Sequence, residues 1–175
     1  MAQFTLTVVP LNIKISPDSL DVTDLKLLEA LQTDASLSNQ ALAERVHISP
    51  PTCLRRVKRL RDAGLIERQI AVLSPDKLSA LLGHGLTAII EITLDRQGAG
   101  QLEAFEEKVV LERAVQQCYR VSPGPDFVLL VHVLDMPGYL ALTQRLFTDD
   151  ANVRNVKAFF STKRSKFEPK VLLRQ

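Results

Sequence analysis

The chain has only two cysteines, Cys53 and Cys118, among its 175 residues. They are too far apart for a CxxC metal or redox pair, and too few for a small secreted domain held together by disulfides. No window approaches the roughly 18 consecutive apolar residues of a membrane span. The first basic residue is Lys14, which does not fit a signal peptide. We therefore expect a protein of the reducing cytoplasm, without a membrane segment.

Motifs for catalysis or metal binding are also scarce. The three histidines, His47, His84 and His132, fall in three different predicted elements and lack the spacing of metal ligands. We find no set of nucleophile and base and no glycine loop for phosphate. With 46% hydrophobic and 24% charged residues, the composition is that of an ordinary globular protein. We therefore expect no enzyme activity, no metal and no other cofactor.

Charge is present but unevenly distributed, although the formal net charge is only +2. Residues 74–153 have six Lys and Arg against eleven Asp and Glu, whereas residues 154–175 have seven against one. Residues 50–63 have five basic side chains against Asp62 alone. Such a concentration suits a polyanion, because phosphate contacts supply most of the sequence-independent affinity for nucleic acids. A solvated helix face fits the same charges, so charge alone leaves both interpretations open.

Three short helices are predicted near the N-terminal end. Asp21 and Asp24 form a helix start, and an apolar stripe at helical spacing follows. Ser38 is expected to cap a second helix. Ser49 is expected to cap a third, whose first position is Pro50.

The connection between the second and third helices is very short, residues 47–49. A joint of this length forces a steep crossing, which is the helix-turn-helix arrangement. His47 lies in the turn, and histidine tolerates a positive φ better than most residues. On the third helix, Leu54, Val57 and Leu60 are expected to face the core. The arginines are then left on the outside of the helix that would enter a groove.

The pattern changes after Gly64, the expected end of the third helix. Residues 65–73 predict extended chain or a small wing, and the Ser-Pro-Asp that follows is expected to break it. The predicted organisation is an N-terminal extension (1–20), a winged helix-turn-helix (21–73), a linker (74–83), an α/β domain (84–166) and a basic tail (167–175).

The second half predicts the element order β-α-β-β-α-β. This is the ferredoxin-like arrangement, in which two helices cover one face of an antiparallel sheet. The other face would be bare. With Ile90, Ile92 and Phe159 among the alternating apolar positions, we expect that face to be buried against another copy of the chain.

These segments resemble a known family. LDVTDLKLLEALQTDASLSNQALAERV and SPPTCLRRVKRLRDAGLI are similar to the winged helix-turn-helix of the Lrp/AsnC (feast/famine) family of transcriptional regulators. EITL, the CYRVS strand, the pair Asp126 and Phe127, and LDM resemble the small-molecule-binding domain of that family. The resemblance implies an α+β fold, with a winged helix-turn-helix followed by a ferredoxin-like βαββαβ domain. It also implies sequence-specific binding of double-stranded DNA and a response to an amino acid or related metabolite.

The resemblance further implies assembly and site residues. Family members form homodimers that assemble into tetramers or octamers, and they bind the effector between subunits near the turn joining the second and third strands. Ligand and assembly are then linked. An arginine of the third helix could read guanine through a bidentate pair. The residues expected to contact DNA are Ser49, Pro51, Thr52, Arg55, Arg56 and Arg59. Those expected to contact the effector are Ser122, Gly124, Asp126 and Phe127.

The effector turn departs from the family pattern. The family usually has a glycine three residues before the aspartate, where this chain has Pro123, and the glycine is displaced to Gly124. Pro123 and Pro125 have no backbone N–H, so a pocket that holds its ligand with backbone donors loses two of them. We expect an altered ligand or a rigid turn without one, and weak or absent binding of common amino acids.

Two alternatives remain at this point. A nucleoid-associated protein that compacts DNA would share the oligomer and the basic helix. A regulator discriminates its site from bulk DNA by about 4–10 kcal/mol, and a compacting protein does so much less. A haem-pathway decarboxylase of the same architecture must hold a tetrapyrrole, and the arginine-rich helix has no evident use there.

Overall fold

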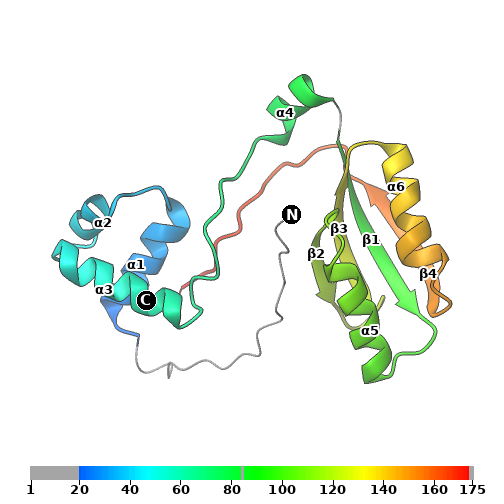
Figure 1. Ribbon diagram of the computed structural model, residues 1–175, viewed down its shortest axis with the longest axis horizontal. Helices are drawn as coiled ribbons and strands as arrows, with labels where there is room; N and C mark the ends of the chain where they lie inside the picture. The colour runs from blue at the N-terminus through cyan, green and yellow to red at the C-terminus, as the bar shows by residue number, and fades with distance from the viewer. Residues whose placement is uncertain (1–19, 84, 174–175) are drawn as a thin grey trace, which may run out of the picture. The chain divides into compact units, whose positions relative to one another are not determined.

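The computed structural model describes residues 20–83 and 85–173 (Figure 1). The chain divides into two compact units. The first ends at Val72 and is joined again by the segment from Lys166, and the second runs from Leu73 to Ser165. Of the expected N-terminal extension, residues 1–19 lie outside the described residues. No described helix is long and apolar enough to cross a membrane.

The first unit contains the three predicted helices. They are α1 (Val22–Thr33), α2 (Asn39–Arg45) and α3 (Pro50–Asp62), and each begins directly after its predicted cap residue. Their apolar faces meet in one cluster, which confirms the pattern of helical spacing. Its buried members are Leu27, Ala30, Leu42, Ala43, Val46, Cys53 and Leu60.

Two of the three predicted helix caps form as expected. The Asp21 carboxylate accepts a hydrogen bond from Asp24 N at 2.9 Å, and the Asp24 carboxylate accepts one from Asp21 N at 3.2 Å. The Ser38 hydroxyl accepts one from Ala41 N at 3.2 Å. Ser49 occupies the cap position of α3 but makes no side-chain cap bond, so that part of the prediction was wrong. Its hydroxyl instead lies 2.8 Å from the Thr52 hydroxyl.

The turn between α2 and α3 uses the left-handed conformation predicted for His47, whose φ is +57°. His47 N donates to Glu44 O at 3.2 Å and Ile48 N donates to Ala43 O at 3.0 Å, which together make a Schellman motif. Gly64, at φ +76°, occupies the same position after α3. These paired bonds set where each helix ends and how the chain leaves it.

One prediction for α3 was wrong by one residue. Leu54 is 62% exposed, whereas its neighbour Cys53 is fully buried. The inward row is therefore Cys53, Val57 and Leu60, which are spaced four and three residues apart on one helix face. A helix turns by about 100° per residue, so a shift of one position carries a side chain from the core to the surface.

The segment predicted as extended chain or a small wing has no helix or strand, whereas the expected linker is partly helical. Residues 65–74, all of them described, form no strand. The expected linker contains an eight-residue helix, α4 (Pro75–Leu82). The Ser-Pro pair ends the preceding stretch as expected, and it also begins this helix, because proline is well suited to the first position of a helix.

The second unit has the predicted βαββαβ order. Its strands are β1 (Leu86–Leu94), β2 (Val115–Arg120), β3 (Phe127–Val133) and β4 (Val153–Phe160). They form an antiparallel sheet in the order β2-β3-β1-β4. The helices are α5 (Ala99–Val110) and α6 (Met136–Thr143), and a π-helical turn, Gln144–Thr148, continues α6.

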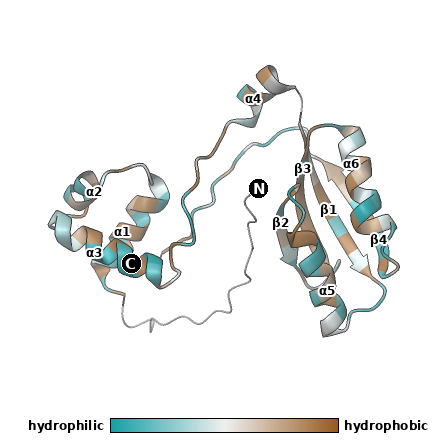
Figure 2. Cartoon of the chain, in the orientation of Figure 1, coloured by the Kyte–Doolittle hydropathy of each residue, from teal (hydrophilic) through white to brown (hydrophobic). Residues whose placement is uncertain are grey.

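The two faces of the sheet are reversed relative to part of the prediction. Ile90 and Ile92 are fully buried in the core cluster that includes side chains of α5 and α6, so they are not on the bare face. Ile89, 43% exposed, and Phe159, 44% exposed, are register partners on that face. Because side chains alternate along a strand, a shift of one residue reverses the face. Figure 2 shows β1 as mainly hydrophobic with a hydrophilic interruption, and the adjacent apolar residues Ile89 and Ile90 leave open from the sequence which of the two faces the core.

The basic tail is held to the first unit. The Gln32 side-chain amide accepts a hydrogen bond from Val171 N and donates one to Val171 O, both at 3.0 Å. The other amide hydrogen of Gln32 is available to Glu29 Oε2 at 2.7 Å. The side chain thus binds an extended backbone in the way a neighbouring strand would, and both of its amide hydrogens have an acceptor.

Candidate functional site

The outer surface of α3 is strongly basic. Arg55, Lys58 and Arg61 are exposed, and none of them forms a hydrogen bond or ion pair with a described residue. Asn39 Nδ2 donates to Pro50 O at 2.9 Å and so links the starts of α2 and α3. Three unpaired cations on a helix held in this way leave their full charge available to an anionic partner.

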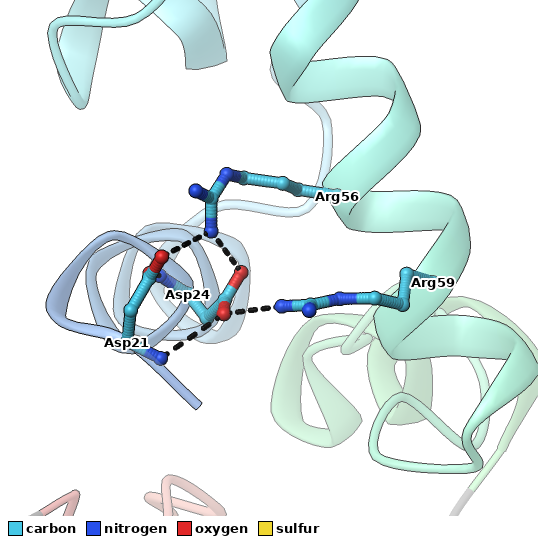
Figure 3. A network of polar contacts seen from close by, with 4 residues as sticks. All are labelled: Asp21, Asp24, Arg56 and Arg59. Carbon is cyan, nitrogen blue, oxygen red and sulfur yellow. Dashed lines mark hydrogen bonds and ion pairs between the residues drawn. The ribbon is translucent and has the colours of Figure 1, made fainter. Parts of the chain in front are cut away.

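Two other arginines of α3 point to α1 instead. Arg56 Nη1 donates to Asp24 Oδ1 at 2.9 Å and to Asp21 Oδ2 at 2.7 Å. Arg59 Nη2 donates to Asp24 Oδ2. Figure 3 shows both guanidinium groups converging on the carboxylates at the start of α1. We had predicted that Arg56 and Arg59 point outward, and the structure gives both a partner within the protein.

Asp24 is the centre of this cluster. Its side chain is fully buried, and it is the only buried polar or charged residue among those described. A carboxylate without a countercharge would be very unfavourable there. The two arginines and the N–H of Asp21 supply three donors to it. Asp24 therefore joins the start of α1 to the middle of α3.

The charges of the cluster stabilise one another. The pKa of Asp21 is lowered, first by the hydrogen bond from the Asp24 backbone N–H and then by the hydrogen bond from Arg56. The pKa of Arg56 is raised, first by its hydrogen bond to Asp21 and then by that to Asp24. The side chain of Arg56 is 23% exposed and that of Arg59 is 47% exposed. Arg59 therefore keeps more surface than Arg56 for a contact outside the protein.

The remaining predicted DNA-contact residues lie at the start of α3. Ser49 and Pro51 are exposed, and Thr52 is half-buried. A hollow of about 220 Å³ further along the helix is lined by Asp21, Arg55, Arg56 and Arg59.

The residue missed by sequence reasoning is Asp24. Its spacing from Asp21 indicated a helix cap and gave no sign that it also pairs with Arg56 and Arg59.

The predicted effector turn is tied to the end of β1. Asp126 Oδ2 accepts a hydrogen bond from Leu94 N at 2.6 Å and one from Gln97 Nε2 at 3.3 Å. Asp126 N donates to Ile92 O at 2.8 Å. The carboxylate of Asp126 therefore already has protein donors, and one of its oxygens accepts both of these bonds.

The other residues of the turn divide into two groups. Ser122 and Gly124 are exposed, and Gly124 has φ +125°, a conformation that favours glycine. The Ser122–Pro123 peptide bond is cis. The ring of Phe127 is fully buried, with its centroid 4.9 Å from that of Phe105. Phe127 therefore belongs to the core of this unit, whereas Ser122 and Gly124 are at its surface.

A hollow that the sequence did not indicate lies beyond the end of β1. It has a volume of about 390 Å³ and is lined by Asp95, Arg96, Gln101, Ala104, Phe105, Asp150, Ala151 and Asn152. Two of its polar side chains, Asp150 and Asn152, are bonded to neighbouring groups. Asn152 Oδ1 accepts from Arg96 N at 2.9 Å, and Asp150 accepts from Lys108 Nζ at 2.9 Å. Burial alone would raise the pKa of Asp150, but the hydrogen bonds from Lys108 and Asn152 N lower it overall.

The described part of the chain offers neither a metal-binding cluster nor a reactive thiol. No group of three or more His, Cys, Asp or Glu residues there is placed to hold a metal ion. Burial, with a smaller contribution from Glu106, raises the pKa of Cys118 to about 11. Burial also raises the pKa of Cys53. Both thiols are therefore protonated at neutral pH, which is the unreactive form.

Comparison with known families divides the chain in the same way. Residues 20–67 match the family model for a winged helix-turn-helix DNA-binding domain. Residues 87–171 match the model for the Lrp/AsnC ligand binding domain. The helix-turn-helix and the βαββαβ unit thus define a class of DNA-binding regulator that carries a ligand-binding domain.

Comparison with individual proteins leads to the same family. The chain is 36% identical over 155 residues to an uncharacterized HTH-type transcriptional regulator of Haemophilus influenzae, covering 89% of this chain and 90% of the relative. It is 38% identical over 123 residues to the leucine-responsive regulatory protein of Escherichia coli, covering 70% and 73% of the two chains. The chain belongs to the Lrp/AsnC family of transcriptional regulators, and these named relatives are regulators rather than enzymes.

Solved structures support the same assignment. An AsnC family transcriptional regulator from Agrobacterium tumefaciens superimposes with a TM-score of 0.76 at 29% identity, over 87% of this chain and 97% of that one. A transcriptional regulator of Neisseria meningitidis in complex with L-Met gives a TM-score of 0.75 at 30% identity, over 87% and 96%. The expected α+β fold and family are therefore confirmed.

Proposed function

We propose that this regulator binds specific sites on double-stranded DNA through the outer surface of α3. The observation that carries the proposal is the row of exposed basic residues Arg55, Lys58 and Arg61, which have no partner among the described residues, on a helix held by the tight turn at His47. The second helix of a helix-turn-helix is the one that enters the major groove. Arg55 lies near its N-terminal end and is free for a bidentate contact to guanine.

The six residues that we predicted to contact DNA then take different roles. Ser49, Pro51 and Thr52 lie at the helix start, next to the expected path of the DNA backbone. Arg56 and Arg59 are engaged with Asp24 and would contribute mainly to placing α3 and to phosphate contacts. Direct base contact is therefore assigned to Arg55 among these six.

Fluorescence anisotropy tests this proposal. The full-length protein is titrated with DNA from upstream of its own gene and with a scrambled duplex of the same length, across a salt series. We expect tighter binding to the first duplex and a steep loss of affinity with salt. Equal affinity for both duplexes would contradict site-specific binding of this DNA and favour the compacting function. Absence of binding to either would overturn the proposal.

The matched variants are Arg55→Ala and Arg113→Ala. Both arginines are exposed, but Arg113 lies in the loop before β2, outside the helix-turn-helix. We expect Arg55→Ala to weaken binding to the preferred duplex about tenfold and to reduce its advantage over the scrambled one. Arg113→Ala should bind like the unaltered protein. Equal effects of the two variants would argue against Arg55 as a base contact.

We further infer that the effector site is the turn around Ser122, Gly124 and Asp126 and that it binds common amino acids weakly. Pro123 and Pro125 have no N–H, and Asp126 N is already bonded to Ile92 O. The Neisseria regulator named above was solved with L-Met, so an amino acid or related metabolite is the ligand class to test. Calorimetric titration with each common amino acid provides the test, and micromolar affinity for one of them would contradict weak binding.

We propose that the working form is a homodimer that assembles into tetramers or octamers. The bare face of the sheet exposes Ile89, Tyr119 and Phe159, which a second copy would cover. Sedimentation velocity on the intact protein and on Phe159→Glu tests this. We expect the variant to shift toward monomer, and an unchanged distribution would place the interface elsewhere.

We also propose that the protein is located in the cytoplasm, since a regulator acts on DNA. We propose no catalytic role for it.

A further inference from the structure

Leu54 is an apolar exception on a charged helix surface. Its side chain is 62% exposed, and it lies between Pro51, three residues earlier, and Lys58, four residues later. Residues at these spacings share one helix face. Arg55, also exposed, lies beside it. This outer face therefore combines one large aliphatic side chain with two cations that have no partner among the described residues.

The core of the first unit does not account for Leu54. The inward side of α3 is occupied by Cys53, Val57 and Leu60. Arg56 and Arg59 occupy the face of α3 that meets the start of α1, where both are bonded to Asp24 (Figure 3). With those two arginines held against α1, Leu54 and Arg55 are the large side chains of the first two turns that remain on the outer face.

A single exposed leucine is common on protein surfaces and by itself has no functional meaning. Leu54 differs from such a residue because of its position in α3. The N-terminal residues of a recognition helix are the ones that meet base edges, and Leu54 is the fifth residue of α3. The cations on either side would meet phosphates and guanine while the leucine faces the floor of the groove.

We propose that Leu54 contacts the 5-methyl group of a thymine in the major groove and so helps to set the sequence preference of this regulator. The inference rests on the proposed function, because it requires α3 to enter the groove. Thymine is the only one of the four bases that presents a methyl group there. An aliphatic side chain placed against a purine edge would cover N7 or the exocyclic group without giving it a hydrogen bond, and cytosine has only a hydrogen where thymine has the methyl group.

The test removes the methyl group from the DNA and the side chain from the protein. The full-length protein first selects a duplex from a random-sequence library. Each thymine of that duplex is then replaced in turn by deoxyuridine, which lacks only the methyl group. We expect one thymine in each half-site at which the replacement weakens binding about fourfold, the value for one apolar carbon removed from water.

The variant Leu54→Ala completes a double-mutant cycle. It should bind the thymine duplex several-fold more weakly than the unaltered protein and should show no further loss with deoxyuridine at those positions. Its salt dependence should be unchanged, because no phosphate contact has been removed. Leu54→Met, which keeps an apolar side chain, should retain sensitivity to the methyl group.

The matched control is Leu140→Ala. Leu140 is 59% exposed and lies on α6, in the other unit, so its removal should leave DNA affinity and methyl sensitivity unchanged. If no thymine is sensitive, or if the sensitivity persists in Leu54→Ala, the inference is overturned while the proposed function stands. If the protein selects no duplex at all, the proposed function is overturned together with it.

Discussion

The two compact units hold themselves together in different ways. In the second unit the core is apolar and includes the buried rings of Phe105, Phe127 and Phe147. In the first unit no aromatic ring is among the buried residues described, and the fully buried Asp24 lies beside the apolar cluster. Small domains bury a smaller fraction of their surface than large ones, so each specific contact contributes more to their stability.

This difference indicates how each unit is adapted to its task. The first unit must present a basic helix to solvent, and the ion pairs with Asp24 and Asp21 hold part of that charge in a defined place. The second unit presents an apolar sheet face instead, and its charges lie at the edges of its core. Mutations should therefore separate the two units by the kind of interaction they remove.

The largest effect is expected from Phe127→Ala. The ring is fully buried and packs on Phe105, so its loss should lower the free energy of unfolding of the second unit by about 3–5 kcal/mol. Hydrogen exchange measured separately for each unit should show faster exchange in β1 and β3 and unchanged exchange in α1 to α3. The control is Leu111→Ala, which removes an exposed side chain from the same unit. Equal destabilisation of both units would mean that they do not fold independently.

A smaller effect is expected from Asp24→Asn. The substitution removes the negative charge that faces Arg56 and Arg59 and should destabilise the first unit by about 2–3 kcal/mol, because both guanidinium groups are partly exposed and can recover some solvation. Urea denaturation followed by circular dichroism measures it. The control Asp62→Asn removes a carboxylate from an exposed site of α3 and should be nearly neutral. If the two variants are equally stable, the cluster contributes nothing.

A gain in stability of about 1 kcal/mol is expected from His47→Gly. His47 has φ +57°, a conformation that costs an L-residue with a Cβ and costs glycine almost nothing. Differential scanning calorimetry should show a higher melting temperature for the first unit. His47→Ala keeps the Cβ and should show no such gain. A lower melting temperature for the glycine variant would mean that the imidazole makes a contribution larger than the strain.

The smallest effects on the free energy of unfolding are expected from lowering the pH. The pKa of Glu112 in the second unit is lowered, mainly by its hydrogen bond from Arg145, as that of Asp21 is lowered in the first. A carboxylate whose pKa is lower in the folded state stabilises the protein above the unfolded pKa, and this contribution is lost as the pH falls through the folded pKa. Both units should therefore become easier to denature with urea below about pH 4. Glu112→Gln should flatten this dependence in the second unit only, and an unchanged slope would contradict the assignment.

Much of the fold could be predicted because its signals are local. Helical spacing of leucines, the caps at Asp21 and Ser38, and the short joint at His47 depend on residues a few positions apart. The errors arose where a shift of one position reverses the outcome. Leu54 and Cys53 are adjacent, as are Ile89 and Ile90, and the apolar character of both members of each pair hides which one faces the core.

The sequence by itself determined the three helices of the first unit, the βαββαβ order of the second, the family and the basic character of α3, because these depend on composition and short-range spacing. Tertiary structure alone decided what the charged and amide side chains do. Asp24 meets Arg56 from 32 positions away, and Gln32 meets Val171 from 139 positions away. No local pattern records such distances, since the chain brings these groups together only after its apolar faces have packed. The division of the α3 arginines into those bonded to α1 and those without a partner among the described residues is therefore a property of the folded unit.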